Sequence, residues 1–187
     1  GIRMTQDLPP QLLKLSKPIV LVGLMGAGKT CIGTRLAAKL GLPFMDADTE
    51  IERAAGCSVA DIFELYGETE FRKGERRVIA RLLKDPVHVL ATGGGAFMDS
   101  ATRKEVRDCA ISVWLRADLN LLVSRTGRRA DRPLLEKGNR REILEQLIEE
   151  RHPIYAEADL VIESARELPD LTVDRLIGAL EKLTGKS

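Results

Sequence analysis

The sequence predicts an α/β protein in which helices flank a parallel β-sheet. Short apolar runs of the kind that form buried strands alternate with segments whose apolar residues recur at helical spacing. That alternation is typical of parallel sheets, in which a helix connects one strand to the next. A chain of 187 residues is long enough for one domain with its own core, so we expect a single three-layer fold.

Five apolar runs have the length and composition of buried strands. We expect these strands at residues 18–22, 44–46, 87–91, 111–115 and 159–162. We expect helices at residues 29–40, over most of 48–84, from 139 onwards and from about 170 to 183. Gly41 is expected to end the first helix, while Ser58 and Asn139 are expected to open helices. A longer amphipathic helix should follow Gly67.

A glycine-rich turn between the first expected strand and helix carries the strongest functional signal. Residues 23–30 read Gly-Leu-Met-Gly-Ala-Gly-Lys-Thr, which matches the phosphate-binding loop (P-loop) pattern G-x-x-x-x-G-K-[ST]. In such a loop backbone N–H groups surround phosphate oxygens, Lys29 reaches the outer phosphates, and Thr30 offers a hydroxyl group to magnesium. The expected ATP contacts in this loop are Gly26, Ala27, Gly28, Lys29, Thr30 and Cys31.

Residues 124–138 depart from the alternating pattern. They show little apolar periodicity and contain Arg125, Arg128, Arg129 and Arg132. A long polar loop in a compact domain needs a reason, and we expect a lid whose arginines stabilise a transferred phosphoryl group. Solvated loop charges are the alternative. The base-reading pattern Asn-Lys-x-Asp of GTP switches is absent, which favours an ATP-using enzyme.

Two further clusters follow expected strands, where the ligand crevice of an α/β sheet lies. Asp46 and Asp48 flank one alanine, and an extended backbone would aim one acid at magnesium and the other at an acceptor. Asp48 could equally cap the following helix, which does not exclude a chemical role. Residues 93–95 are three glycines, which suit either a close backbone approach or a flexible turn. Since this third strand ends without an aspartate, Asp46 would supply the carboxylate for magnesium.

Composition argues against several classes of protein. Lys and Arg number 29 and Asp and Glu 28, and aromatic residues make up 4%, so a nucleic-acid or membrane-surface partner is not expected. No apolar run reaches the length of a membrane span, and the first residues lack the apolar core of a signal peptide. Three scattered cysteines predict neither zinc nor disulfides. We therefore expect a cytoplasmic protein, and its size is compatible with a monomer.

Six segments, in this order, resemble the shikimate kinase family. They are residues 23–30, 44–52, 67–75, 92–95, 132–135 and 151–155. The resemblance implies a nucleoside-monophosphate-kinase-like P-loop fold with a five-stranded parallel sheet. It also implies a substrate-binding region near 48–77 and a lid near 124–138. The kinase domain would span 18–187 after an N-terminal extension of 1–17, in which residues 1–3 could precede a natural start at Met4.

The resemblance also implies a reaction and a role for each matching residue. The family transfers the γ-phosphoryl group of ATP to the 3-hydroxyl group of shikimate with the help of Mg²⁺. Asp48 would then bind the shikimate hydroxyls and act as base or orienting group, while Arg72 and Arg151 would grip the carboxylate. The other implied roles are catalysis by Lys29 and Arg132, acceptor contacts by Gly93, Gly94 and Gly95, adenine or ATP contacts by Arg125, Arg132, Arg166 and Pro169, and metal binding by Thr30 and Asp46.

These roles are chemically coherent, but each has a simpler alternative. The planar guanidinium group suits a carboxylate, yet Arg72 could pair with Glu68 or Glu75 on its own helix, and Arg151 with its neighbour Glu150. Another small-acceptor kinase of the same fold, for gluconate or a nucleoside monophosphate, would keep the P-loop and lid. A non-catalytic ATP-binding protein would keep the P-loop. Cys31 departs from the family, many members of which have Thr or Ser there.

Overall fold

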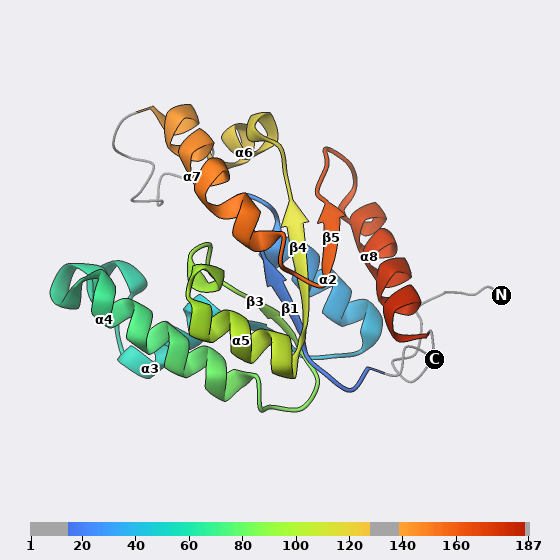
Figure 1. Ribbon diagram of the computed structural model, residues 1–187, viewed down its shortest axis with the longest axis horizontal. Helices are drawn as coiled ribbons and strands as arrows, with labels where there is room; N and C mark the ends of the chain where they lie inside the picture. The colour runs from blue at the N-terminus through green and yellow to red at the C-terminus, as the bar shows by residue number, and fades with distance from the viewer. Residues whose placement is uncertain (1–14, 128–138, 186–187) are drawn as a thin grey trace.

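The computed structural model describes residues 15–127 and 139–185, and in them it shows the predicted α/β fold (Figure 1). All strands of its five-stranded sheet are parallel, in the order β2-β3-β1-β4-β5. They are β1 (Ile19–Val22), β2 (Phe44–Asp46), β3 (Val89–Ala91), β4 (Ile111–Arg116) and β5 (Leu160–Glu163). The central strand β1 is an unbroken apolar run buried at every residue, as expected of a strand covered on both faces.

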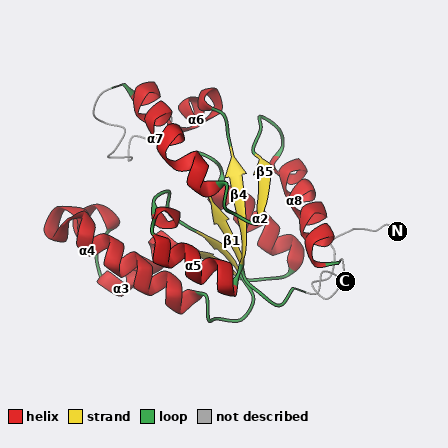
Figure 2. Ribbon diagram, in the orientation of Figure 1, coloured by secondary structure: helices red, strands yellow, loops and turns green. Residues whose placement is uncertain are grey.

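Helices cover both faces of this sheet (Figure 2). The helices are α2 (Lys29–Leu40), α3 (Ala47–Ala55), α4 (Val59–Leu82), α5 (Ser100–Cys109), α6 (Leu119–Thr126), α7 (Arg140–Tyr155) and α8 (Pro169–Thr184), with a short 3₁₀ helix η1 (Ala96–Met98). In Figure 1, α2 and α8 lie on one side of the sheet and α3, α4 and α5 on the other, with α7 above α5. Among the described residues, no helix is long and apolar enough to cross a membrane.

The strand order explains how the candidate residues meet. β3 lies between β2 and β1, and all three run in the same direction. The P-loop follows β1, Asp46 ends β2, and residues 93–95 come soon after β3. Three segments that are distant in sequence therefore emerge at one edge of the sheet, the edge where ligands bind in such folds.

The helix signals read from the sequence were confirmed in part. Ser58 caps α4 by accepting a hydrogen bond from the Asp61 N–H, and Asn139 caps α7. At Gly67 the backbone of α4 is non-helical, with φ +86°, so two helical segments meet there, as the sequence indicated. Asp48 is not the cap of α3: Asp46 is, and its carboxylate accepts a hydrogen bond from the Thr49 N–H at 3.2 Å.

Two helices were not predicted. The first is α5, whose polar sequence buries Thr102 and Val106 as its only fully buried described residues. The second is α6, and it corrects the expected lid boundary, because residues 124–126 form its last turn and are not loop. The rest of the predicted lid, residues 128–138 with Arg128, Arg129 and Arg132, lies outside the described residues.

Candidate active site

The P-loop forms a cradle built mainly from backbone. Gly26 and Gly28 have φ of +87° and +99°, values that side-chain-bearing residues rarely adopt. Within the described chain no side chain caps α2, so the first N–H groups of that helix point at the loop without a side-chain acceptor. Lys29 Nζ donates to the carbonyl groups of Gly23 and Leu24 at 2.5 and 3.0 Å, and so spans the mouth of the cradle. This arrangement suits a polyphosphate.

A pair of oxygen donors lies beside the cradle. Thr30 Oγ1 donates to Asp46 Oδ2 at 3.4 Å. A hydroxyl and a carboxylate are ligands that Mg²⁺ prefers, and Mg²⁺ completes its shell with water and substrate phosphates. The described residues hold no cluster of three or more His, Cys, Asp or Glu side chains that could bind a metal ion. The pair therefore fits a magnesium ion carried by a nucleotide.

Arg125 ties the P-loop to the segment after β5. Its guanidinium group donates to the carbonyl groups of Gly26 and Ala27, both at 3.1 Å, and to Ser164 Oγ at 3.0 Å and the Ala165 carbonyl at 3.2 Å. Burial lowers the pKa of Arg125. The structure thus brings Arg125 next to the 166–169 segment that was predicted to flank the adenine.

Each glycine of the 93–95 run faces a different functional side chain. A Cβ on Gly93 would lie 3.1 Å from Asp48 Oδ1, and one on Gly94 would lie 3.1 Å from Arg151 Nη1. A Cβ on Gly95 would lie 2.8 Å from Arg72 Cζ, which is too close for a real side chain. The absence of side chains in the run therefore lets these three charged groups approach its backbone closely.

Asp48 lies in the first turn of α3 and is half-buried. Burial is the main cause that raises the pKa of Asp48, and the neighbouring Asp46 carboxylate adds to the rise. The positive charge of Lys29 in the P-loop opposes the rise in the pKa of Asp48. Asp48 thus lies beside the glycine run with a raised pKa, which makes its carboxylate a candidate proton acceptor.

Arg72 is held by a buried acid. Its Nη1 lies 2.8 Å from Glu75 Oε1, one helical turn along α4, and the Glu75 side chain is 3% exposed. Burial raises the pKa of Glu75, and the hydrogen bond from Arg72 opposes that rise. The salt bridge that stood as the simple alternative for Arg72 is therefore present. It leaves the Gly95 side of the guanidinium group facing the glycine run.

The structure thus brings together Asp48, Arg72 and Arg151 around residues 93–95, as the sequence indicated, with Lys29 close by. Reasoning from sequence gave Glu75 no role beyond a possible ion pair. The sequence did carry a sign of its burial, because Glu75 falls among the regularly spaced apolar residues Phe71, Val78 and Ile79 of α4.

The structure also places the other predicted residues. Arg166 is exposed, and Pro169 begins α8. The two residues predicted to be core, His88 and Trp114, are 0% and 4% exposed.

The fold and the site define a class of protein. A parallel sheet, a P-loop between its central strand and a helix, and a cluster of charged side chains at the same edge are the features of a P-loop phosphotransferase. Comparison with known proteins identifies the family. A family model described as shikimate kinase matches residues 25–181.

Individual relatives agree. The chain is 57% identical to a shikimate kinase of Paramagnetospirillum magneticum over 89% of this chain and 86% of that protein. It is 53% identical to one of Rhodopseudomonas palustris over 88% and 81%. A solved shikimate kinase from Acinetobacter baumannii in complex with shikimate is 37% identical and superposes with a TM-score of 0.88, covering 95% of this chain and 99% of that one. The chain belongs to the shikimate kinase family and is an ATP-dependent kinase.

Proposed function

We propose that this protein transfers the γ-phosphoryl group of ATP to the 3-hydroxyl group of shikimate, giving shikimate 3-phosphate and ADP. The observation that carries the proposal is the cluster in which Asp48, Arg151 and Arg72 face consecutive glycines, and we propose that this cluster forms the acceptor pocket. Arginine forks suit a carboxylate and an aspartate suits hydroxyl groups, so the set matches a small hydroxylated carboxylic acid. The relative that was solved with shikimate supports the same acceptor.

In the proposed reaction, the oxygen of the 3-hydroxyl group forms a bond to the γ-phosphorus. The bond between that phosphorus and the bridging β–γ oxygen breaks, and ADP leaves with the bridging oxygen. The hydroxyl proton passes to the Asp48 carboxylate, whose raised pKa makes it a better acceptor than an exposed aspartate. The backbone cradle and Lys29 hold the phosphates in line, which is the main requirement of phosphoryl transfer.

Thr30 and Asp46 are the residues that we propose hold Mg²⁺. When bound, the ion would neutralise charge on the phosphates and orient them. We also propose the two sequence-based assignments that the structure leaves untested. Arg132 would contact the phosphates, and Arg125 with the Arg166 and Pro169 segment would flank the adenine. Full turnover by an Arg132→Ala variant would refute the first of these two roles.

The proposal is tested by ADP release in a coupled optical assay with ATP and Mg²⁺. Shikimate, gluconate, AMP and a blank without acceptor are compared side by side. We expect release with shikimate alone. Release with gluconate or AMP instead would keep the P-loop assignment and refute the acceptor assignments. The absence of ADP release with every acceptor, in a folded sample that binds ATP, would refute the proposed activity.

A further inference from the structure

We propose that Tyr155 is a positioning residue for the acceptor, because it fastens the end of α7 that carries Arg151 to the backbone of Gly94. This inference rests on the proposed function, since it assumes that Arg151 and the glycine run bind shikimate. Tyr155 would touch neither substrate. It would act by fixing the distance between two groups that do.

The contact is buried and direct. Tyr155 is 0% exposed, and its hydroxyl group donates a hydrogen bond to the carbonyl oxygen of Gly94, 61 residues away in sequence. Burial raises the pKa of Tyr155 to about 12, so the phenol stays protonated and remains a donor at every pH at which the enzyme would work. Gly94 is the residue whose Cα faces Arg151 Nη1. One hydroxyl group therefore holds the backbone that lies opposite the arginine.

Arg151 and Tyr155 lie four residues apart on α7 and so share one face of the helix. Arg151 acts on the Tyr155 phenol both by its charge and by a side-chain hydrogen bond, and both oppose the rise of the Tyr155 pKa that burial causes. Between them stands Pro153, which has no N–H and leaves the last turn of α7 without one helix hydrogen bond. The Arg151 turn therefore relies on contacts outside the helix for its position.

An aromatic cluster supplies the rest of that support. The Tyr155 ring lies 5.8 Å from the Trp114 ring of β4, and the His152 ring lies 4.8 Å from Trp114. These contacts hold the ring of Tyr155 even when its hydroxyl group is absent. Tyr155→Phe thus removes the hydrogen bonds of the hydroxyl group, to Gly94 and to Arg151, while it keeps the packing of the ring, and so separates positioning from stability. Trp114, the single tryptophan of the chain, reports fluorescence from this cluster.

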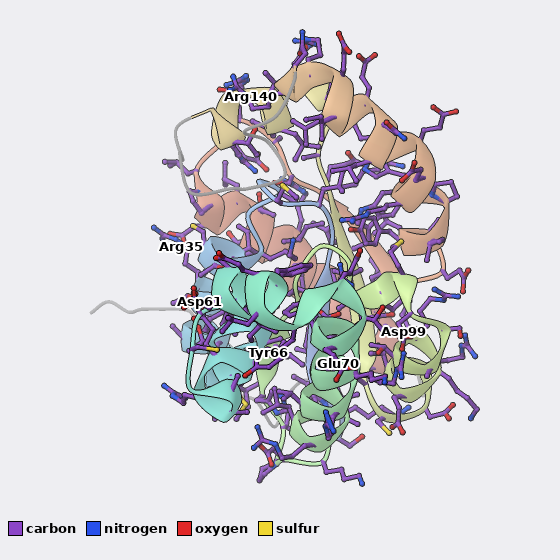
Figure 3. All side chains as sticks on the ribbon, turned by 90° about the vertical axis from the view of Figure 1, so that its left-hand side faces the viewer. Arg35, Asp61, Tyr66, Glu70, Asp99 and Arg140 are labelled. Atoms are coloured by element: carbon purple, nitrogen blue, oxygen red, sulfur yellow. The ribbon has the colours of Figure 1, made fainter. Side chains whose placement is uncertain are left out.

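The test compares Tyr155→Phe with wild type and with Tyr66→Phe. Tyr66 is the other tyrosine of the chain, 63% exposed on α4 and labelled in Figure 3. Steady-state kinetics give the KM for each substrate, and a titration with ATP counts the folded, binding-competent molecules. In Tyr155→Phe we expect the KM for shikimate to rise about tenfold, the size of one lost hydrogen bond. We expect the KM for ATP to stay within about twofold, and Tyr66→Phe to match wild type.

A double-mutant cycle with Arg151→Ala tests the link to Arg151. If Tyr155 acts through Arg151, Tyr155→Phe should add less than about threefold in that background. An unchanged KM for shikimate in Tyr155→Phe, or a parallel rise of both KM values, would overturn the inference. So would a full tenfold effect in the Arg151→Ala background. A wild-type protein without shikimate-dependent turnover would refute the proposed function and this inference together, whereas an active wild type isolates the role of Tyr155.

Discussion

The two halves of the site are built in different ways. The nucleotide cradle comes from eight consecutive residues, and its geometry lies in the backbone, with three glycines at positive φ and, in the described chain, a helix start that no side chain caps. The proposed acceptor pocket comes from α3, α4, α7 and the glycine run, and its chemistry lies in charged side chains. We propose that the cradle can serve any acceptor, whereas the pocket selects one.

That difference separates the kinetic effects of substitutions. A change in the cradle should affect turnover with every acceptor, because it acts on the phosphates. A change in the pocket should affect shikimate and leave ATP binding intact. Asp48 belongs to both sets, since Lys29 of the cradle and Arg72 of the pocket both lower its pKa against the effect of burial.

The largest effect is expected in the cradle. Lys29→Ala removes the cation that reaches the outer phosphates, and kcat should fall on the order of 10⁴-fold, the size seen for cations that stabilise a transferring phosphoryl group. Lys39→Ala is the matched control, at the far end of the same helix, where Lys39 pairs with Asp174 at 2.9 Å. For both variants, coupled kinetics measure kcat, and a circular dichroism spectrum checks that the protein is folded. A Lys29→Ala variant with a near-native rate would refute the cradle assignment.

Asp48→Asn should lower kcat about 10³-fold, the usual contribution of a positioned proton acceptor. The same change should raise the melting temperature at pH 7. The sign follows from the raised pKa: the folded state binds the proton more tightly than the unfolded state, so an ionised Asp48 costs stability at pH values above that pKa. Glu50→Gln on the same helix is the control for both readouts. Loss of activity together with a lower melting temperature would contradict this account.

Arg72→Lys tests the pocket alone. Lysine keeps a charge for the buried Glu75 but loses the planar fork, so the KM for shikimate should rise about 30-fold. The KM for ATP should stay within about twofold. Arg77→Lys, exposed on the same helix, should leave both constants unchanged. Equal changes in the KM for shikimate and the KM for ATP in Arg72→Lys would contradict separate roles for the cradle and the pocket.

The smallest effect concerns how the pocket is attached to the core. Arg76 of α4 donates two hydrogen bonds to Asp99, at 2.9 and 2.7 Å, and lowers its pKa to about 2 (Asp99 is labelled in Figure 3). Asp99→Asn should cost about 1 kcal/mol at pH 7, because Arg76 is half exposed and solvent weakens the pair.

The pH dependence follows from the lowered pKa of Asp99. The stabilisation that the ionised Asp99 gives to the folded state is fully present at pH values above its ordinary pKa of 3.8, and it is lost as the pH falls through about 2. Melting temperatures of wild type and variant should therefore converge between about pH 4 and pH 2. Asp61→Asn, another surface acid, serves as control. A gap that stays constant over this range would refute the pair.

The sequence predicted the cradle better than the rest because the cradle is contiguous. Residues 23–30 carry their own signal, and the buried run of β1 and the glycine after α2 fix the neighbouring elements. Arg72 and Arg151 were identified through the family resemblance, since an arginine beside a glutamate on a helix equally fits a surface ion pair. The hydrogen bond from Tyr155 to Gly94 spans 61 residues and leaves no local pattern.

The missed elements have physical reasons too. The polar sequence of α5 gives little apolar periodicity, and α6 is eight residues long and follows directly on β4. The arginines of the 124–138 segment suggested one loop, but Arg125 belongs to a helix and bonds the P-loop. Charge composition alone could not separate it from the arginines that follow.

The most direct test of the account is the position of the phosphoryl group in the product. Phosphorus and proton NMR of the mixture of shikimate, ATP and Mg²⁺ after turnover identifies which carbon bears the phosphate. If Asp48 takes the proton of the 3-hydroxyl group while Arg72 and Arg151 hold the carboxylate, phosphorus should couple to the proton at C3 alone. Coupling at C4 or C5, or no phosphorylated shikimate from an enzyme that consumes ATP, would contradict the arrangement of the pocket described above.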